Sequence, residues 1–123
     1  MRLLTHNLLM CNLKSCTGRN FPLVLQANEI TEESSEFNQE LTLKMLNKID
    51  WRVFHQTLEN LGHSLPEELN QEDRSNEALL QRIHHLMFNI IITTGTLICQ
   101  NCNRAYPIDK GIPNMLLEEN EEL

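Results

Sequence analysis

Four cysteines are the residues of this sequence whose type and spacing could do chemistry. Cys11 and Cys16 enclose four residues, Cys99 and Cys102 enclose two, and 82 residues separate the two pairs. Four thiolates can surround a zinc ion tetrahedrally at roughly 2.3 Å each and leave no open coordination position. The second pair lies in a polar turn with the spacing of a zinc knuckle. The cysteines therefore predict a closed, structural zinc site that ties the beginning of the chain to its end.

Three other interpretations of the cysteines stay open at this stage. Disulfides are disfavoured because the N-terminus does not read as an export signal, since Thr5, His6 and Asn7 interrupt its apolar stretch. A redox pair at Cys99 and Cys102 lacks the βαβ setting that such a motif needs. The four residues could also be unrelated buried side chains, because cysteine often packs as a small hydrophobe.

Hydrophobic periodicity predicts helices in the middle of the chain. Apolar residues recur at helical spacing over 37–49, 51–61 and 79–88. Ser34 or Ser35 is the expected N-cap of the first helix. For the second, Asp50 is the expected N-cap and Gly62 the stop signal. The segments between these helices are polar, and the one at 63–75 is a charged loop.

Strands are predicted on either side of these helices. Residues 21–26 form a strand that begins at or near Pro22 on a sheet edge, and 27–35 form a polar connection. The β-branched stretch at 90–99 predicts a hairpin around Thr94–Gly95. Two short strands follow at 104–108 and 112–117, joined at 109–111, and one or two helical turns are expected at 3–10. The order of elements predicts an α+β fold in which a helical segment interrupts a small sheet.

Composition and charge exclude several classes of protein. Hydrophobic residues make up 41% of the 123 residues, which is too many for a disordered chain. No apolar run exceeds four residues, so no membrane-spanning helix is expected. The net charge of -7 is concentrated in residues 29–87 and in the last six residues, whereas residues 1–28 carry +3 and 88–117 carry +1. Such a thin supply of cations disfavours direct binding of nucleic acid.

Signatures of catalysis are missing from the sequence. The four glycines are isolated, so no glycine-rich loop can hold a phosphate. A closed four-thiolate zinc site has no position for a reactive water. Composition and spacing therefore favour a protein that is not an enzyme.

Six blocks of sequence resemble a known family, the small zinc-ribbon activator subunit of eukaryotic and archaeal methyltransferases. The chain is similar to that family in collinear order over nearly its whole length. The matching blocks are MRLLTHNLL at 1–9, FPLVLQA at 21–27, EFNQELTLKMLNKIDW at 36–51, IHHLM at 83–87, GTLIC at 95–99 and YPIDKGIPNMLL at 106–117. The charged loop at 63–75 has no match.

The resemblance implies a partner protein for class I methyltransferases rather than an enzyme. Members of the family bind and stabilise catalytic subunits, one at a time, that use S-adenosylmethionine to modify transfer RNA, ribosomal RNA and a translation termination factor. The cofactor expected on this chain is structural zinc, and S-adenosylmethionine is expected on the partner. RNA is reached only through the partner, no membrane is involved, and the expected location is the cytoplasm and nucleus.

The resemblance also implies a division of the chain into two parts. The first and last segments, 1–32 and 89–123, are expected to form a zinc-ribbon-like lobe with a small antiparallel sheet. Residues 33–88 are expected to form an inserted lobe of three helices. The four cysteines match those members of the family that keep both pairs.

A partner-binding surface is expected beside the C-terminal strand. An exposed terminal strand can extend a partner's sheet by strand addition, and apolar side chains near it can cover an apolar patch on the partner. The alternative is that these side chains fill the chain's own core. The expected partner-binding residues are Leu4, Leu8, Ile112, Pro113, Asn114, Met115 and Leu116.

Two other functions remain open from sequence. The first is a free-standing zinc-ribbon adaptor that contacts RNA or ribosomal protein directly, which would require a cationic stripe that the charge distribution does not provide. The second is a small thiol oxidoreductase, which would have a reactive Cys99 and contain no metal.

Overall fold

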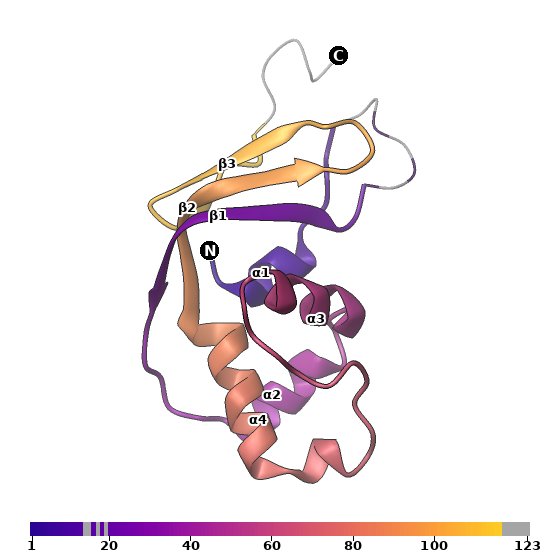
Figure 1. Cartoon of the computed structure of the whole chain (residues 1–123), viewed down its shortest axis with the longest axis vertical. Helices are drawn as coiled ribbons and strands as arrows, with labels where there is room; N and C mark the ends of the chain where they lie inside the picture. Colours follow the sequence, from indigo (N-terminus) through magenta and orange to yellow (C-terminus); the bar gives the residue numbers. More distant parts are fainter. Residues whose placement is uncertain (14–15, 17, 19, 117–123) are drawn as a thin grey trace.

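The computed structural model describes residues 1–13, 16, 18 and 20–116 and has an α+β fold (Figure 1). One antiparallel sheet has the strand order β1-β2-β3-β4. Its strands are β1 (Leu23–Glu32), β2 (Ile90–Cys99), β3 (Ala105–Asp109) and β4 (Ile112–Pro113). The helices are α1 (Leu3–Leu8), α2 (Gln39–Leu46), α3 (Trp51–Asn60) and α4 (Glu77–His84), with a 3₁₀ turn at Asp73–Ser75 and a π turn at His85–Asn89. The predicted fold class is confirmed.

The pairing of β1 with β2 joins the two ends of the chain. The ladder runs from Leu23 opposite Cys99 to Glu32 opposite Ile90, so residues far apart in sequence lie side by side along the whole strand. Figure 1 shows this pair as the longest part of the sheet, with the helices on the side of β1 away from β3. Among the described residues, no helix has the length and apolar character required to cross a membrane.

The predicted hairpin at Thr94–Gly95 is wrong, because β2 continues through these residues as one strand. Gly95 lies opposite Ala27, where the register of β1 shifts. A Cβ atom on Gly95 would lie 2.4 Å from the carbonyl oxygen of Gln26. The glycine therefore permits a close approach of two backbones at a bulge rather than a turn. The predicted connection at 27–35 is likewise wrong for 27–32, which continue β1.

The helices have mostly the predicted ends. The side chain of Asp50 caps α3 by accepting a hydrogen bond from the amide of Val53, and Gly62 follows the helix with φ of +90°. The cap of α2 is Asn38, which accepts from the amide of Leu41, and not Ser34 or Ser35. The helix begins later than predicted because Asn38 provides a local cap directly before its first turn.

β3 and β4 form the tight hairpin predicted at 109–111. Lys110 and Gly111 both have positive φ, at 51° and 78°, as a type I′ turn requires. β4 is shorter than predicted, since ladder pairs end at Pro113, although the amide of Asn114 still donates to the carbonyl of Pro107 at 2.8 Å. Residue 117 lies outside the described residues.

One hydrophobic core connects the sheet with the helices. α1 contacts α3, the π turn and β2. Buried side chains from the terminal segments and from the middle of the chain belong to the same cluster, for example Leu3, Leu58, Ile83 and Leu97. The terminal segments therefore form a platform to which the helices attach through α1. The division into a lobe at 1–32 and 89–123 and an insert at 33–88 stays a prediction.

Candidate metal centre

The four cysteines come together in one buried cluster. Their sulfur atoms all lie within 4.8 Å of one another. Cys11 and Cys16 follow α1, Cys99 is the last residue of β2, and Cys102 lies in the turn between β2 and β3. Cys11, Cys16 and Cys99 are buried and Cys102 is partly buried. The β1–β2 ladder positions the cluster, because it pairs Leu23 with Cys99 at the end of the sheet.

The turn between β2 and β3 directs the second pair of sulfurs to one side. The amide of Cys99 donates to the carbonyl of Arg104 at 3.0 Å, and the amide of Asn103 donates to the carbonyl of Cys99 at 2.9 Å. Asn103 has φ of 62°, a conformation that asparagine tolerates better than most residues. The amides of Cys11 and Cys16 are held by the carbonyls of Asn20 and Leu13.

The sulfur positions fit a tetrahedral metal site. Four sulfurs at 2.3 Å from a central zinc ion would lie roughly 3.8 Å from one another. The Sγ atoms of Cys11 and Cys102 are 3.7 Å apart, and those of Cys16 and Cys99 are 3.6 Å apart. These separations are too long for a disulfide, which requires about 2.0 Å, and all four cysteines are free. The cluster could therefore hold a metal ion, and its all-thiolate donor set suits zinc.

The thiols of the cluster differ in acidity. Burial acts to raise the pKa of Cys99, but hydrogen bonds from the backbone amides of Cys102 and Asn101 outweigh it and lower that pKa to about 7. Burial raises the pKa of Cys102 to about 12, and the neighbouring thiols add to that effect. Several negative sulfurs this close together repel one another unless a cation lies between them. A divalent ion would supply that charge and allow all four to ionise.

Two side chains that the sequence did not indicate contact the sulfurs. The hydroxyl of Tyr106 lies 3.0 Å from the Sγ of Cys11, and the amide group of Asn101 donates to the Sγ of Cys16 at 3.2 Å. Tyr106 is fully buried, and its pKa is raised to about 12 by burial and by the contact with Cys11. The position of Tyr106 in β3, four residues after Cys102, carries no motif that would have revealed this role.

His6 lies five residues before Cys11 in the sequence, but it is not part of the cluster. Its Nε2 atom lies 2.7 Å from the carbonyl oxygen of Leu23. The side chain is 1% exposed. Because burial disfavours the charged ring, the pKa of His6 is lowered, although the bond to Leu23 acts in the opposite direction. His6 thus attaches α1 to the start of β1.

The segment 112–116 alternates between exposed and half-buried residues. Ile112, Asn114 and Leu116 are exposed, and Pro113 and Met115 between them are half-buried. With Asn12, these five residues line a shallow depression of about 580 Å³. The Nδ2 atom of Asn12 donates to the carbonyl of Met115 at 2.8 Å, which attaches the segment beside the metal cluster. We call residues 112–116 the docking segment.

The expected partner-binding residues of α1 separate into two groups. Leu8 is exposed, whereas Leu4 is half-buried and packs against the core. Met10, which the sequence did not single out, is exposed just before Cys11. Leu8 and Met10 differ from Leu4 in that their side chains are exposed. This difference depends on how α1 packs against the rest of the chain, which the sequence does not specify.

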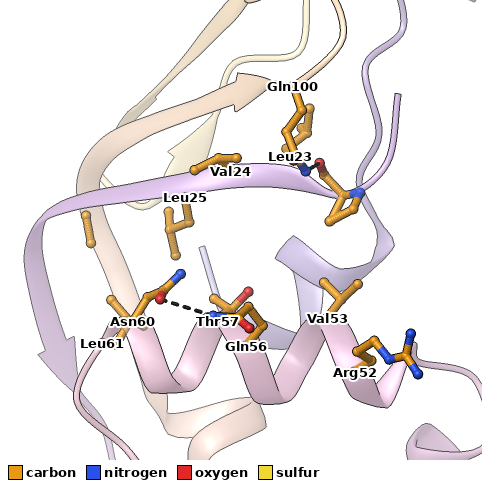
Figure 2. A pocket seen from close by; sticks show the side chains of 12 residues that line it. Leu23, Val24, Leu25, Arg52, Val53, Gln56, Thr57, Asn60, Leu61 and Gln100 are labelled. Carbon is orange, nitrogen blue, oxygen red and sulfur yellow. Dashed lines mark hydrogen bonds between the residues drawn. The ribbon is translucent and has the colours of Figure 1, made fainter. Parts of the chain in front are cut away.

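A second hollow lies between β1 and α3 (Figure 2). Figure 2 shows Leu25 on β1, Val53 and Thr57 on α3, and Leu61 directly after α3 around it, with Gln56 bonded to Asn60. Of the twelve described residues that line this hollow, Arg52 is the one charged side chain, and none is a histidine, cysteine or carboxylate. The hollow therefore offers no pair of groups for general acid–base catalysis.

Comparison with known proteins finds relatives over nearly the whole chain. The model of a family described as Trm112p-like protein matches residues 2–111. The chain is 38% identical over 124 residues to the Arabidopsis thaliana multifunctional methyltransferase subunit TRM112 homolog A, covering 98% of this chain and 99% of that protein. It is 39% identical over 125 residues to the Schizosaccharomyces pombe multifunctional methyltransferase subunit trm112, with coverage of 98% and 99%.

A solved structure has a similar fold. It is a chain of the E. cuniculi Mtq2–Trm112 complex, which is described as responsible for methylating the eRF1 translation termination factor. The two chains superpose with a TM-score of 0.53 over 94% of this chain and 95% of the other, at 22% identity. At that identity, the likeness concerns the fold.

Proposed function

Because the chain belongs to the Trm112p-like family, we propose that it is a non-catalytic activator subunit of class I methyltransferases that use S-adenosylmethionine. The curated relatives are named multifunctional methyltransferase subunits and match nearly the full length of this chain. The E. cuniculi complex contains such a subunit beside Mtq2 and methylates eRF1. The partners proposed for this chain are catalytic subunits that modify tRNA, rRNA and a translation termination factor, bound one at a time as a heterodimer.

The observation that carries this proposal is a group of exposed apolar side chains beside the cysteine cluster. Leu8 is 57% exposed and Met10 51%, and on the docking segment Ile112 is 68% and Leu116 80% exposed. The bond from Asn12 to Met115 connects the two segments that carry them. Ile112 and Leu116 line the same depression, and exposed apolar side chains that lie together are typical of a protein interface.

The docking segment can bind a partner by strand addition. β4 lies at one edge of the sheet, so its outer side faces no other strand among the described elements. A strand of the catalytic subunit that pairs with 112–116 would gain backbone hydrogen bonds, and its apolar neighbours would cover Ile112 and Leu116. Asn114 is exposed like Ile112 and Leu116, whereas Pro113 and Met115, and Leu4 on α1, are half-buried.

The metal in this proposal is structural zinc, held by Cys11, Cys16, Cys99 and Cys102. A zinc ion with four protein ligands supplies folding energy rather than chemistry, on the order of 10–16 kcal/mol of apparent binding free energy. Its role here is to fix the end of β2 to the segment after α1. S-adenosylmethionine belongs to the partner in this proposal, as do the catalytic residues, and the proposed location is the cytoplasm and nucleus.

Activation follows from mass action in this scheme. A subunit that binds only the folded catalytic partner raises that partner's stability and lifetime. Covering an apolar surface on the partner also removes a site of aggregation. No chemistry by this chain is required.

Co-expression with a class I methyltransferase from the same organism tests the proposal. We expect a one-to-one heterodimer on size-exclusion chromatography, and more soluble and more active methyltransferase than when it is expressed alone. Equal solubility and activity without this chain would contradict the proposal. Stable association of the purified chain with RNA, without any methyltransferase, would favour the adaptor function instead.

A further inference from the structure

Hydrogen bonds connect a metal ligand with the docking segment. The hydroxyl of Tyr106 lies 3.0 Å from the Sγ of Cys11 and donates to the Oδ1 of Asn12 at 3.0 Å. Asn12 in turn donates from Nδ2 to the carbonyl of Met115 at 2.8 Å. We propose that Tyr106 and Asn12 couple metal binding at Cys11 to the docking segment, so that zinc and the methyltransferase bind this chain cooperatively. This inference rests on the proposed function.

Burial makes the connection at Tyr106 specific. Tyr106 is 0% exposed, so water cannot replace the partners of its hydroxyl. The backbone amide of Asn12 also donates to this hydroxyl at 3.2 Å. Asn12 therefore contacts Tyr106 through both its main chain and its side chain, and a displacement of one is transmitted to the other.

The hydroxyl of Tyr106 has one hydrogen and two acceptors within reach. These acceptors are the Sγ of Cys11 and the Oδ1 of Asn12, each 3.0 Å from the hydroxyl oxygen. A change in the position of the Cys11 sulfur when it ligates a metal therefore changes how the hydroxyl is oriented toward Asn12.

A second contact reaches the docking segment from the ring of Tyr106. The guanidinium carbon of Arg104 lies 4.3 Å from the centre of that ring, a distance at which cation and π system attract. The Nη2 atom of Arg104 also lies 3.4 Å from the carbonyl oxygen of Leu116. The hydroxyl of Tyr106 is thus connected to Met115 through Asn12. Its ring is connected to the next residue, Leu116, through Arg104.

Among the described residues, two further hydrogen bonds are donated by backbone amides of the docking segment beyond Pro113. The amide of Asn114 bonds to Pro107, and the amide of Leu116 bonds to the Oδ1 of Asn114. The hydrogen bond from Asn12 to Met115 joins the docking segment to the residue that follows Cys11. The strength of this hydrogen bond therefore affects how firmly Ile112 and Leu116 are held in the conformation that binds a partner.

Thermodynamic reciprocity gives a test that does not depend on turnover. If zinc strengthens binding of the methyltransferase, the methyltransferase must strengthen binding of zinc by the same factor. The zinc dissociation constant of the full chain would be measured by competition with a chromogenic chelator, with and without a saturating catalytic subunit. We expect the partner to tighten zinc binding about tenfold in the wild-type chain.

Three variants separate coupling from general damage. Tyr106→Phe keeps the buried ring and loses the hydroxyl, and Asn12→Ala removes an exposed side chain with little risk to folding. In both variants, the methyltransferase should tighten zinc binding by less than about twofold. Asn101→Ala is the matched control, because it removes a hydrogen bond to a different ligand, Cys16. It should weaken zinc binding but keep the tenfold factor.

A measurement on the chain alone separates this inference from the proposed function. Exchanging zinc for the larger cadmium ion should shift the amide NMR signals of 114–116 in the wild type and in Asn101→Ala, and not in Asn12→Ala. An unchanged spectrum of 114–116 in the wild type, or an equal coupling factor in all variants, would overturn the inference. If cadmium shifts these signals in the wild type and the chain binds no methyltransferase, the proposed function would be overturned. The connection between the metal site and the docking segment would then still hold.

Discussion

The side-chain amide of Asn7 forms two hydrogen bonds with the backbone of Asp50, 43 residues away. Its Oδ1 atom accepts from the amide of Asp50 and its Nδ2 atom donates to the carbonyl, both at 2.9 Å. Asn7 is buried on α1, and Asp50 is the residue that caps α3. This pair therefore attaches α3 to α1 and the terminal platform.

We predict that Asn7→Ala destabilises the chain by about 1–3 kcal/mol, because it leaves the amide and carbonyl of Asp50 without their partner in a partly buried place. Chemical denaturation of the zinc-loaded chain measures this loss. Asn60→Ala, on the exposed face of α3, is a control that should change the free energy of unfolding by less than about 0.5 kcal/mol. An equal effect of both changes would show that Asn7 does not hold α3.

Gly95 is predicted to be intolerant of a side chain, although it lies within a strand. Gly95→Ala places a methyl group against the carbonyl of Gln26, which belongs to the backbone of β1 and cannot turn away. We expect a loss of about 1–3 kcal/mol, the usual cost of forcing atoms into a packed region. The free energy of unfolding would be measured by denaturant titration, and a stability equal to that of the wild type would show that β1 and β2 can separate there at no cost.

Removal of the metal ligands is predicted to destabilise the end of the sheet. The double change Cys99→Ser and Cys102→Ser should abolish zinc binding and lower the melting temperature, as should a strong chelator added to the unchanged chain. Metal content and thermal unfolding measure both effects. In a heterodimer that stays assembled, turnover should remain unchanged, because a four-thiolate site has no position for a reactive water. A fall in turnover of the intact heterodimer would contradict a structural role.

Partner binding is predicted to depend on the exposed apolar residues of the docking segment. Ile112→Asp should abolish co-purification with the methyltransferase and leave the melting temperature unchanged, since the side chain is 68% exposed. Ile30→Asp provides a matched control, because Ile30 is an exposed isoleucine on β1, at the opposite edge of the sheet. Loss of the heterodimer in both variants, or in neither, would place the interface elsewhere.

Acidic pH is predicted to weaken the fold through His6. Its pKa is lowered by burial in the folded chain, so below about pH 6.5, the ordinary value, the unfolded chain binds more protons than the folded one. The contribution of His6 to stability is thus complete above that pH and is lost as the pH falls toward its lowered pKa, by at most about 1.4 kcal/mol per pH unit.

The variant His6→Gln isolates this effect, because its side chain can still donate to the carbonyl of Leu23 but does not titrate. Unfolding free energies of both zinc-loaded chains would be compared between pH 5 and 8. We expect a smaller pH dependence in the variant over this range. Identical slopes would show that His6 is protonated in the folded chain as readily as in the unfolded one.

Local signals in the sequence were sufficient for several parts of the structure. The cysteine spacing predicted one cluster, Asp50 and Gly62 predicted the ends of α3, and Lys110–Gly111 lies in the predicted turn. The cap and the turn act over a few residues, because each satisfies its own backbone groups locally. The cysteines were recognised by residue type and by the spacing within each pair, although the two pairs lie 82 residues apart. The family resemblance added the partner, which composition and spacing did not contain.

Tertiary structure decided the rest. The sequence predicts a turn at Gly95, because a glycine among β-branched residues looks the same whether the chain reverses there or a second strand approaches closely. Only the register of β1 against β2, set by packing over many residues, distinguishes the two cases. Tyr106 and Asn12 meet across 94 residues for the same reason. The sequence by itself determined which residues could hold a metal, and the folded chain determined which side chains surround it and which remain exposed for a partner.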